Sequence, residues 1–77
     1  MDKKTLALAQ LLIARLERIS ADSFWAHRAS GVKGSLLKML EKSQKGRPVR
    51  QAELKRAMDL GFFMLEKAAK EQYTPGS

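Results

Sequence analysis

The stretch from Trp25 to Gly34 gathers residue types that often carry chemistry. It contains the only Trp, the only His and two of the five glycines of this 77-residue chain. A catalytic His needs a positioned partner and a nucleophile, and a metal site needs several ligands. The chain has no Cys and no second His, and only Asp22 lies close to His27 in sequence. We therefore expect His27 to be a surface or packing residue.

The sequence also lacks a nucleotide-binding glycine loop and a pair of carboxylates placed for acid–base catalysis. Gly31 and Gly34 lack the spacing and the preceding strand of a nucleotide-binding glycine loop. Carboxylates such as Glu66 and Glu71 have no spacing that would force them into a shared apolar site, so we expect them to be solvated. The sequence therefore predicts a protein that is not an enzyme and needs no small-molecule substrate, cofactor or metal ion.

The spacing of the apolar residues predicts the elements that carry these side chains. Placed at about 100° per residue, they form one apolar face in each of three segments, over 3–19, 22–43 and 49–72. Ser20 or Asp22 is expected to cap the second helix, and Gly46 to end it at positive φ. The predicted fold is an all-α, up-down-up three-helix bundle, with one domain over 1–73 and a flexible tail over 74–77.

The second predicted helix allows two interpretations of the opening stretch. If it is continuous, Trp25 joins the core face with Ala29, Val32 and Leu36. Three small residues then form a strip for close helix packing, namely Ala26, Ser30 and Gly34. If the helix breaks near Gly31, the residues Ala29-Ser-Gly-Val-Lys-Gly-Ser-Leu-Leu-Lys-Met-Leu40 resemble the turn and recognition helix of helix-turn-helix proteins. The resemblance implies that Gly31 forms the turn, that Val32, Leu37 and Leu40 point inward, and that Lys33, Ser35 and Lys38 face DNA.

The positive charge is confined to the middle of the chain. The formal net charge is +7, and residues 28–56 carry nine basic and two acidic side chains, whereas the segments on either side are close to neutral. A localised basic segment can bind phosphates and release counterions. We therefore expect a small binding protein whose basic surface engages nucleic acid, either DNA or RNA. The predicted contacts are Arg28, Lys33, Lys38, Lys42, Lys45, Arg47 and Arg50.

An alternative function is a protein-interaction module, acting as a homodimer or an adaptor. Leu60 and Phe63, and to a lesser extent Leu11, fall outside the apolar faces, and Phe24 falls nearer the basic side. Spare apolar side chains on a small bundle are often buried by a second copy or another protein. We expect Leu60 and Phe63 to be the partner-binding residues in that case.

The first 19 residues are not expected to direct the chain to a membrane. Their apolar run is shorter than the roughly 20 residues of a membrane-spanning helix, charged residues follow it at once, and no signal-peptide cleavage site is evident. Binding of this helix to a membrane surface would use the apolar face that the core requires. We therefore expect a cytoplasmic protein.

Overall fold

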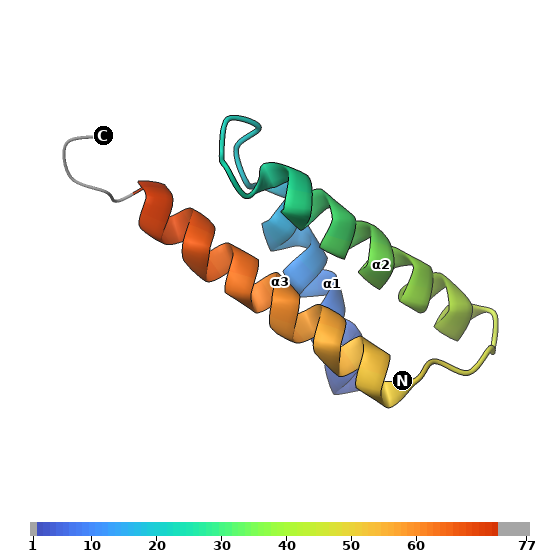
Figure 1. Cartoon of the computed structure of the whole chain (residues 1–77). Coiled ribbons are helices and arrows are strands. Elements are labelled where there is room, and N and C mark those ends of the chain that lie inside the picture. Colours follow the sequence, from blue (N-terminus) through green and yellow to red (C-terminus); the bar gives the residue numbers. More distant parts are fainter. Residues whose placement is uncertain (1, 73–77) are drawn as a thin grey trace.

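The computed structural model describes residues 2–72, with side chains through Glu71, and contains three helices. They are α1 (Lys3–Glu17), α2 (Ala26–Gln44) and α3 (Gln51–Gln72), and every pair of helices is in contact. Figure 1 shows α2 and α3 side by side, with α1 behind them. The predicted up-down-up three-helix bundle is confirmed, whereas the predicted tail over 74–77 lies outside the described residues.

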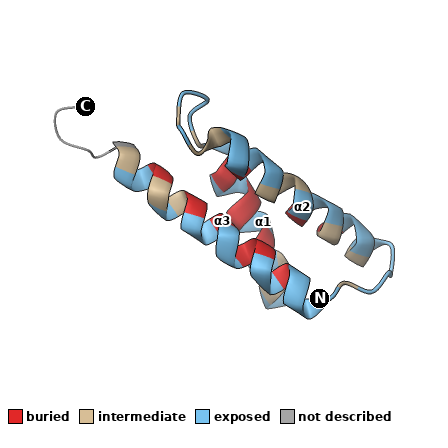
Figure 2. Ribbon diagram, in the orientation of Figure 1, coloured by how far each residue is buried: buried red, intermediate tan, exposed pale blue. Residues whose placement is uncertain are grey.

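The core lies along the line where the three helices face one another. Leu12 of α1 and Leu36 of α2 are the largest fully buried side chains, and α3 contributes Leu54, Met58 and Met64. The buried positions fall on the inward sides of all three ribbons, and the outward sides are exposed (Figure 2). The amphipathic pattern of the sequence therefore accounts for the core.

A close approach between two helices occurs at Gly61 and not at Gly34 of the predicted strip of small residues. A Cβ atom at Gly61 would lie 2.7 Å from Leu12 Cδ2, because α1 passes directly over this point of α3. At Gly34, by contrast, an added Cβ would meet nothing within 4 Å, and Ser30 is exposed. The prediction of a close-packing strip is therefore wrong for Ser30 and Gly34, and the structure gives no test of it at Ala26, which is half-buried.

The predicted helix boundaries need correction at three points. α1 ends at Glu17 instead of residue 19, α2 begins at Ala26 instead of residue 22, and α3 begins at Gln51 instead of residue 49. Ser20 does not cap α2, because its Oγ accepts a hydrogen bond from Asp22 N–H at 3.3 Å within the connection. These short polar residues stabilise a turn locally, so the helix starts only after it.

The N-terminus of α1 has a side-chain cap of its own. Thr5 N–H donates to Asp2 Oδ1 at 2.7 Å, which satisfies one of the free N–H groups of the first turn. Hydrogen bonding by Thr5 stabilises the charged carboxylate and so lowers the pKa of Asp2 below its usual value.

The connection between α1 and α2 is held by a carboxylate from the far end of the chain. Ser23 Oγ donates to Glu71 Oε2 at 3.0 Å, and Phe24 N–H donates to Glu71 Oε1 at 3.1 Å. The Ser23 Oγ also accepts from Trp25 N–H at 3.1 Å, so the same network satisfies the backbone just before α2. Glu71 and Ser23 therefore accept the backbone hydrogen bonds before α2, a role that was predicted for Ser20 or Asp22.

Replacing Glu71 by Ala should lower the free energy of unfolding by about 1 to 2 kcal/mol, because two hydrogen bonds to a charged, partly buried acceptor are lost. Urea denaturation followed by circular dichroism measures the change. Glu66→Ala is the control, since Glu66 forms an exposed pair with Lys70 at 3.1 Å and the substitution should cost less than about 0.5 kcal/mol. Equal losses in the two variants would contradict a role for Glu71 in holding the connection.

None of the helices within residues 2–72 has both the length and the apolar character needed to cross a membrane.

Candidate nucleic-acid interface

The end of α2 is closed by a glycine in the left-handed conformation, as predicted. Gly46 has φ +74°, its N–H donates to Ser43 O at 3.1 Å, and Arg47 N–H donates to Lys42 O at 2.9 Å. This pair of hydrogen bonds is the Schellman arrangement, which reverses the chain sharply at a helix C-terminus. The turn brings the backbone of Arg47 back against the last turn of α2, next to Lys42.

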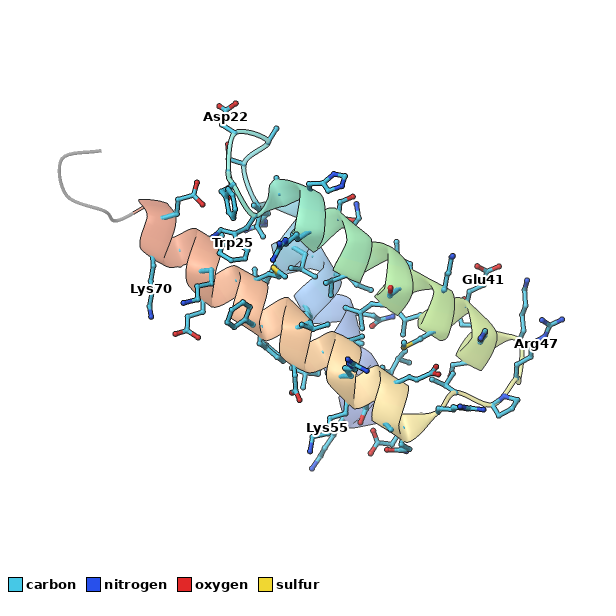
Figure 3. All side chains as sticks on the ribbon, in the orientation of Figure 1. Asp22, Trp25, Glu41, Arg47, Lys55 and Lys70 are labelled. Carbon is cyan, nitrogen blue, oxygen red and sulfur yellow. The ribbon has the colours of Figure 1, made fainter. Side chains whose placement is uncertain are left out.

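Basic side chains gather at this end of the bundle as a result. Residues 38–50 carry five basic side chains and one acidic side chain. Four of them, with Glu41, line a shallow hollow of about 200 Å³. Arg50 follows at the start of α3. We call this group the basic end, and it comprises Lys38, Lys42, Lys45, Arg47 and Arg50. Figure 3 shows Arg47 on the loop at this end, far from Trp25 and Asp22.

Only part of the positive charge at the basic end is neutralised within the protein. Lys45 Nζ lies 3.0 Å from Glu41 Oε1, and Arg50 forms a long, exposed pair with Glu53 at 4.0 Å. The other three cations form no ion pair in the part of the chain that the structure describes, namely Lys38, Lys42 and Arg47. These groups are available to an external anion.

The demands of the fold do not explain this crowding of charge. Lys38 and Lys42 are four residues apart on one helix face, where like charges cost about 0.2–0.5 kcal/mol. The dipole of α2 favours a cation such as Lys42 in its last turn, but the N-terminus of α3 disfavours Arg50. An anion bound at the basic end would relieve both repulsions.

Two of the seven predicted contact residues lie elsewhere. Lys33 is half-buried on the side of α2 that faces α1, and its Nζ lies 4.0 Å from Glu17 Oε1. Arg28 lies near the start of α2, about 20 Å along the helix from Lys42, with its guanidinium 5.8 Å from the Trp25 ring centroid. The predicted surface therefore divides into the basic end, Arg28 near the opposite end of α2, and Lys33 on another side.

The helix-turn-helix interpretation is wrong. α2 runs without interruption through Gly31, which has no positive φ, so no turn separates two helices there. Leu37, which should point inward in that motif, is exposed, and Lys33 faces α1. Local sequence resembles the motif because Gly suits a turn, but the flanking residues stabilise a continuous helix.

Exposed apolar side chains occupy two faces of the bundle. Leu60 and Phe63 are exposed on the outer surface of α3, around a shallow depression of about 450 Å³. Leu8 and Phe62 are 42% and 44% exposed along the groove between α1 and α3. A core this small cannot cover every residue of each apolar face, so residues at the edges stay in contact with water.

Trp25 contacts the core from its edge. It is half-buried, packs against the buried cluster and touches the rings of Phe24 and Phe63. The prediction that Trp25 anchors the core is therefore confirmed only in part, since one side of its ring system belongs to an aromatic group at the surface.

No group of three or more His, Cys, Asp or Glu side chains that could hold a metal ion occurs among the described residues. Comparison of the chain with protein-family models, with curated proteins and with solved structures found no match.

Proposed function

We propose that the protein is a small non-enzymatic binding protein that engages nucleic-acid phosphates through its basic end. The observation that carries this proposal is the closure of the α2–α3 loop at Gly46, which gathers five cations, three of them without an ion-pair partner among the described residues. A polyanion with regularly spaced charges can contact all of these cations along its length, and each contact that it makes releases a counterion and adds to its affinity.

The geometry favours contact with a phosphate backbone over insertion into a groove. The basic end consists of a helix terminus, a loop and the start of another helix, and its hollow is shallow. Within residues 2–72 no recognition helix projects from the bundle, because α2 is continuous and its inward face is buried. Phosphate contacts of this kind fix position and affinity and carry no sequence information directly.

The test is a titration of labelled single-stranded DNA, single-stranded RNA and duplex DNA at two salt concentrations. Five phosphate contacts on a single strand predict a slope of log affinity against log salt of about −3.5, and so about a hundredfold loss of affinity between 50 and 200 mM salt. Failure to bind any of the three nucleic acids at the lower salt concentration, or binding unaffected by salt, would refute the proposal.

A second candidate function is a protein-interaction module, and the exposure of Leu60 beside Phe63 favours it. A second copy or another protein that covers the depression on α3 would bury both side chains. If copies of the chain associate there, Leu60→Asp should convert a dimer into a monomer without lowering the helix content. Sedimentation velocity at increasing protein concentration, with Leu11→Asp on α1 as the control, measures this. A wild-type protein that stays monomeric throughout would exclude the homodimer.

A further inference from the structure

Three aromatic side chains meet where the start of α2 lies against the middle of α3, away from the basic end. The rings of Phe24 and Trp25 are nearly perpendicular, with centroids 5.2 Å apart, and those of Trp25 and Phe63 are also perpendicular, 6.0 Å apart. Edge-to-face contacts of this kind are favourable between aromatic rings. Trp25 lies between the start of α2 and α3 in Figure 3. Its ring contacts Phe24, which precedes it in the chain, and Phe63 of α3. We call these three residues the aromatic cluster.

The two outer rings of the aromatic cluster are open to solvent although their positions are constrained. Phe24 is 74% exposed and Phe63 is 44% exposed, whereas Trp25 is half-buried against the core. The backbone of Phe24 is held by its hydrogen bond to Glu71, and Phe63 lies in the middle of α3. Exposed rings on a constrained backbone lose little conformational entropy when a flat ligand stacks on them.

A cation accompanies each side of the cluster. The guanidinium of Arg28 lies 5.8 Å from the Trp25 ring centroid, and Lys67 Nζ lies 5.4 Å from the Phe63 ring centroid. Neither cation forms an ion pair with a carboxylate within the described chain. Aromatic faces next to unpaired cations suit a ligand that presents planar bases and phosphates in alternation.

We propose that the aromatic cluster is a base-stacking site, and that the nucleic acid bound by the protein is therefore single-stranded. This inference rests on the proposed function, because the basic end supplies the phosphate contacts that bring the strand to the protein. Unpaired bases offer their faces to Phe24 and Phe63, whereas the bases of a duplex are already stacked on one another. Arg28 and Phe63 lie about 20 Å along their helices from Lys42 and Arg50, so a strand of several nucleotides connects the two ends.

The single Trp gives a direct measurement of stacking. Oligo(dT) of about 16 nucleotides, the upper range of small single-strand binding sites, should quench the fluorescence of Trp25 as it binds. Inorganic polyphosphate should bind in a salt-dependent manner at the basic end and leave the fluorescence unchanged, because it has no bases. A duplex of the same length should bind at least about tenfold more weakly than the single strand, since it loses the stacking contact.

The adjacent residues Phe62 and Phe63 provide a matched pair of variants. Both are 44% exposed, but Phe62 lines the groove between α1 and α3, whereas Phe63 belongs to the aromatic cluster. Phe63→Ala should weaken oligo(dT) binding about tenfold and leave the salt slope unchanged, and Phe62→Ala should alter neither. Phe24→Ala should weaken binding similarly, and it provides a second test if Phe63→Ala proves to be unfolded by circular dichroism.

The possible outcomes separate this inference from the proposed function. If single strand and duplex bind equally, if the cluster variants bind like Phe62→Ala, or if polyphosphate also quenches Trp25, the stacking site is refuted while phosphate binding stands. If no nucleic acid binds, both proposals are refuted. If Phe63→Ala abolishes a dimer and leaves nucleic-acid binding intact, the cluster is a protein interface and the stacking site is refuted.

Discussion

Gly61→Ala should destabilise the bundle in the wild-type chain and stabilise it in a Leu12→Ala background. In the wild type the new Cβ would lie 2.7 Å from Leu12 Cδ2, and Leu12 is only 1% exposed, so its side chain has little room to move. Overpacking of about 2 kcal/mol then outweighs the gain of about 1 kcal/mol in helix propensity, for a net loss of about 1 kcal/mol.

Removing the Leu12 side chain reverses this balance. Leu12→Ala alone should cost about 3 kcal/mol, a large share of the total stability of a domain of this size, because it leaves a cavity beside Gly61. In that background the added methyl group fills part of the cavity and also favours the helix, so Gly61→Ala should raise stability by about 1 kcal/mol. Urea denaturation of the four proteins of this double-mutant cycle measures the coupling, about 2 kcal/mol.

Gly31→Ala is the control for the effect of helix propensity alone. Gly31 lies within α2, and an added Cβ there would meet nothing within 4 Å. The substitution should therefore stabilise the bundle by up to about 1 kcal/mol in either background. If Gly61→Ala stabilised the wild type as well, α1 and α3 would not approach as closely as the structure indicates, and if it destabilised both backgrounds, Leu12 would not be the side chain that the new Cβ meets.

The comparison of Gly34 with Gly61 shows how far the sequence predicts the packing. Apolar periodicity identified the three helices and most buried positions, because burial of an amphipathic face depends mainly on the order of residues along one helix. Close packing depends on which side of a second helix passes over a glycine, and that relation between segments does not appear in the spacing of either one. Gly34 has small residues at spacings of four in its own helix, but a Cβ added there would meet nothing within 4 Å. Gly61 instead lies beneath Leu12 of α1.

The start of α2 was predicted wrongly for a related reason. Ser20 and Asp22 are good capping residues, so the local sequence favours a helix that begins near residue 22. The structure satisfies this backbone through Glu71, which is 47 residues from Phe24 along the chain. A contact over that distance has no local signal, whereas the left-handed turn at Gly46 depends on one residue and could be predicted.

The residues of the candidate site could be predicted from the sequence, but the separation of Arg28 and Lys33 from the basic end could not. The distribution of charge along the chain identifies the basic segment. The turn expected at Gly46 accounts for the contact between the backbones of Lys42 and Arg47. Helical geometry turns Lys33 toward Glu17 of α1, and the same geometry carries Arg28 toward Trp25. The aromatic cluster joins residues from two segments, so no spacing along the chain groups Phe24 with Phe63, and only the packing of α3 against the start of α2 brings them near the same Trp25 ring.

Replacing four cations of the basic end by Gln should nearly abolish binding to single strands. The variant combines Lys38→Gln, Lys42→Gln, Arg47→Gln and Arg50→Gln. On a single strand, each phosphate contact contributes about 0.7 to the salt slope, so the slope should fall from about −3.5 to about −0.7. At 100 mM salt the same relation predicts a loss of affinity of about 600-fold. Fluorescence titration with oligo(dT) at several salt concentrations measures both quantities.

The control variant removes the same charge from α1 and its C-cap, through Lys3→Gln, Lys4→Gln, Arg15→Gln and Arg18→Gln. Both variants lower the formal net charge by four, so they weaken the long-range attraction of a polyanion to a similar degree. Only the first variant removes the cations gathered by the turn at Gly46, so only it should change the salt slope strongly. Equal losses of affinity in the two variants would mean that binding follows net charge, and the basic end would then not be a site.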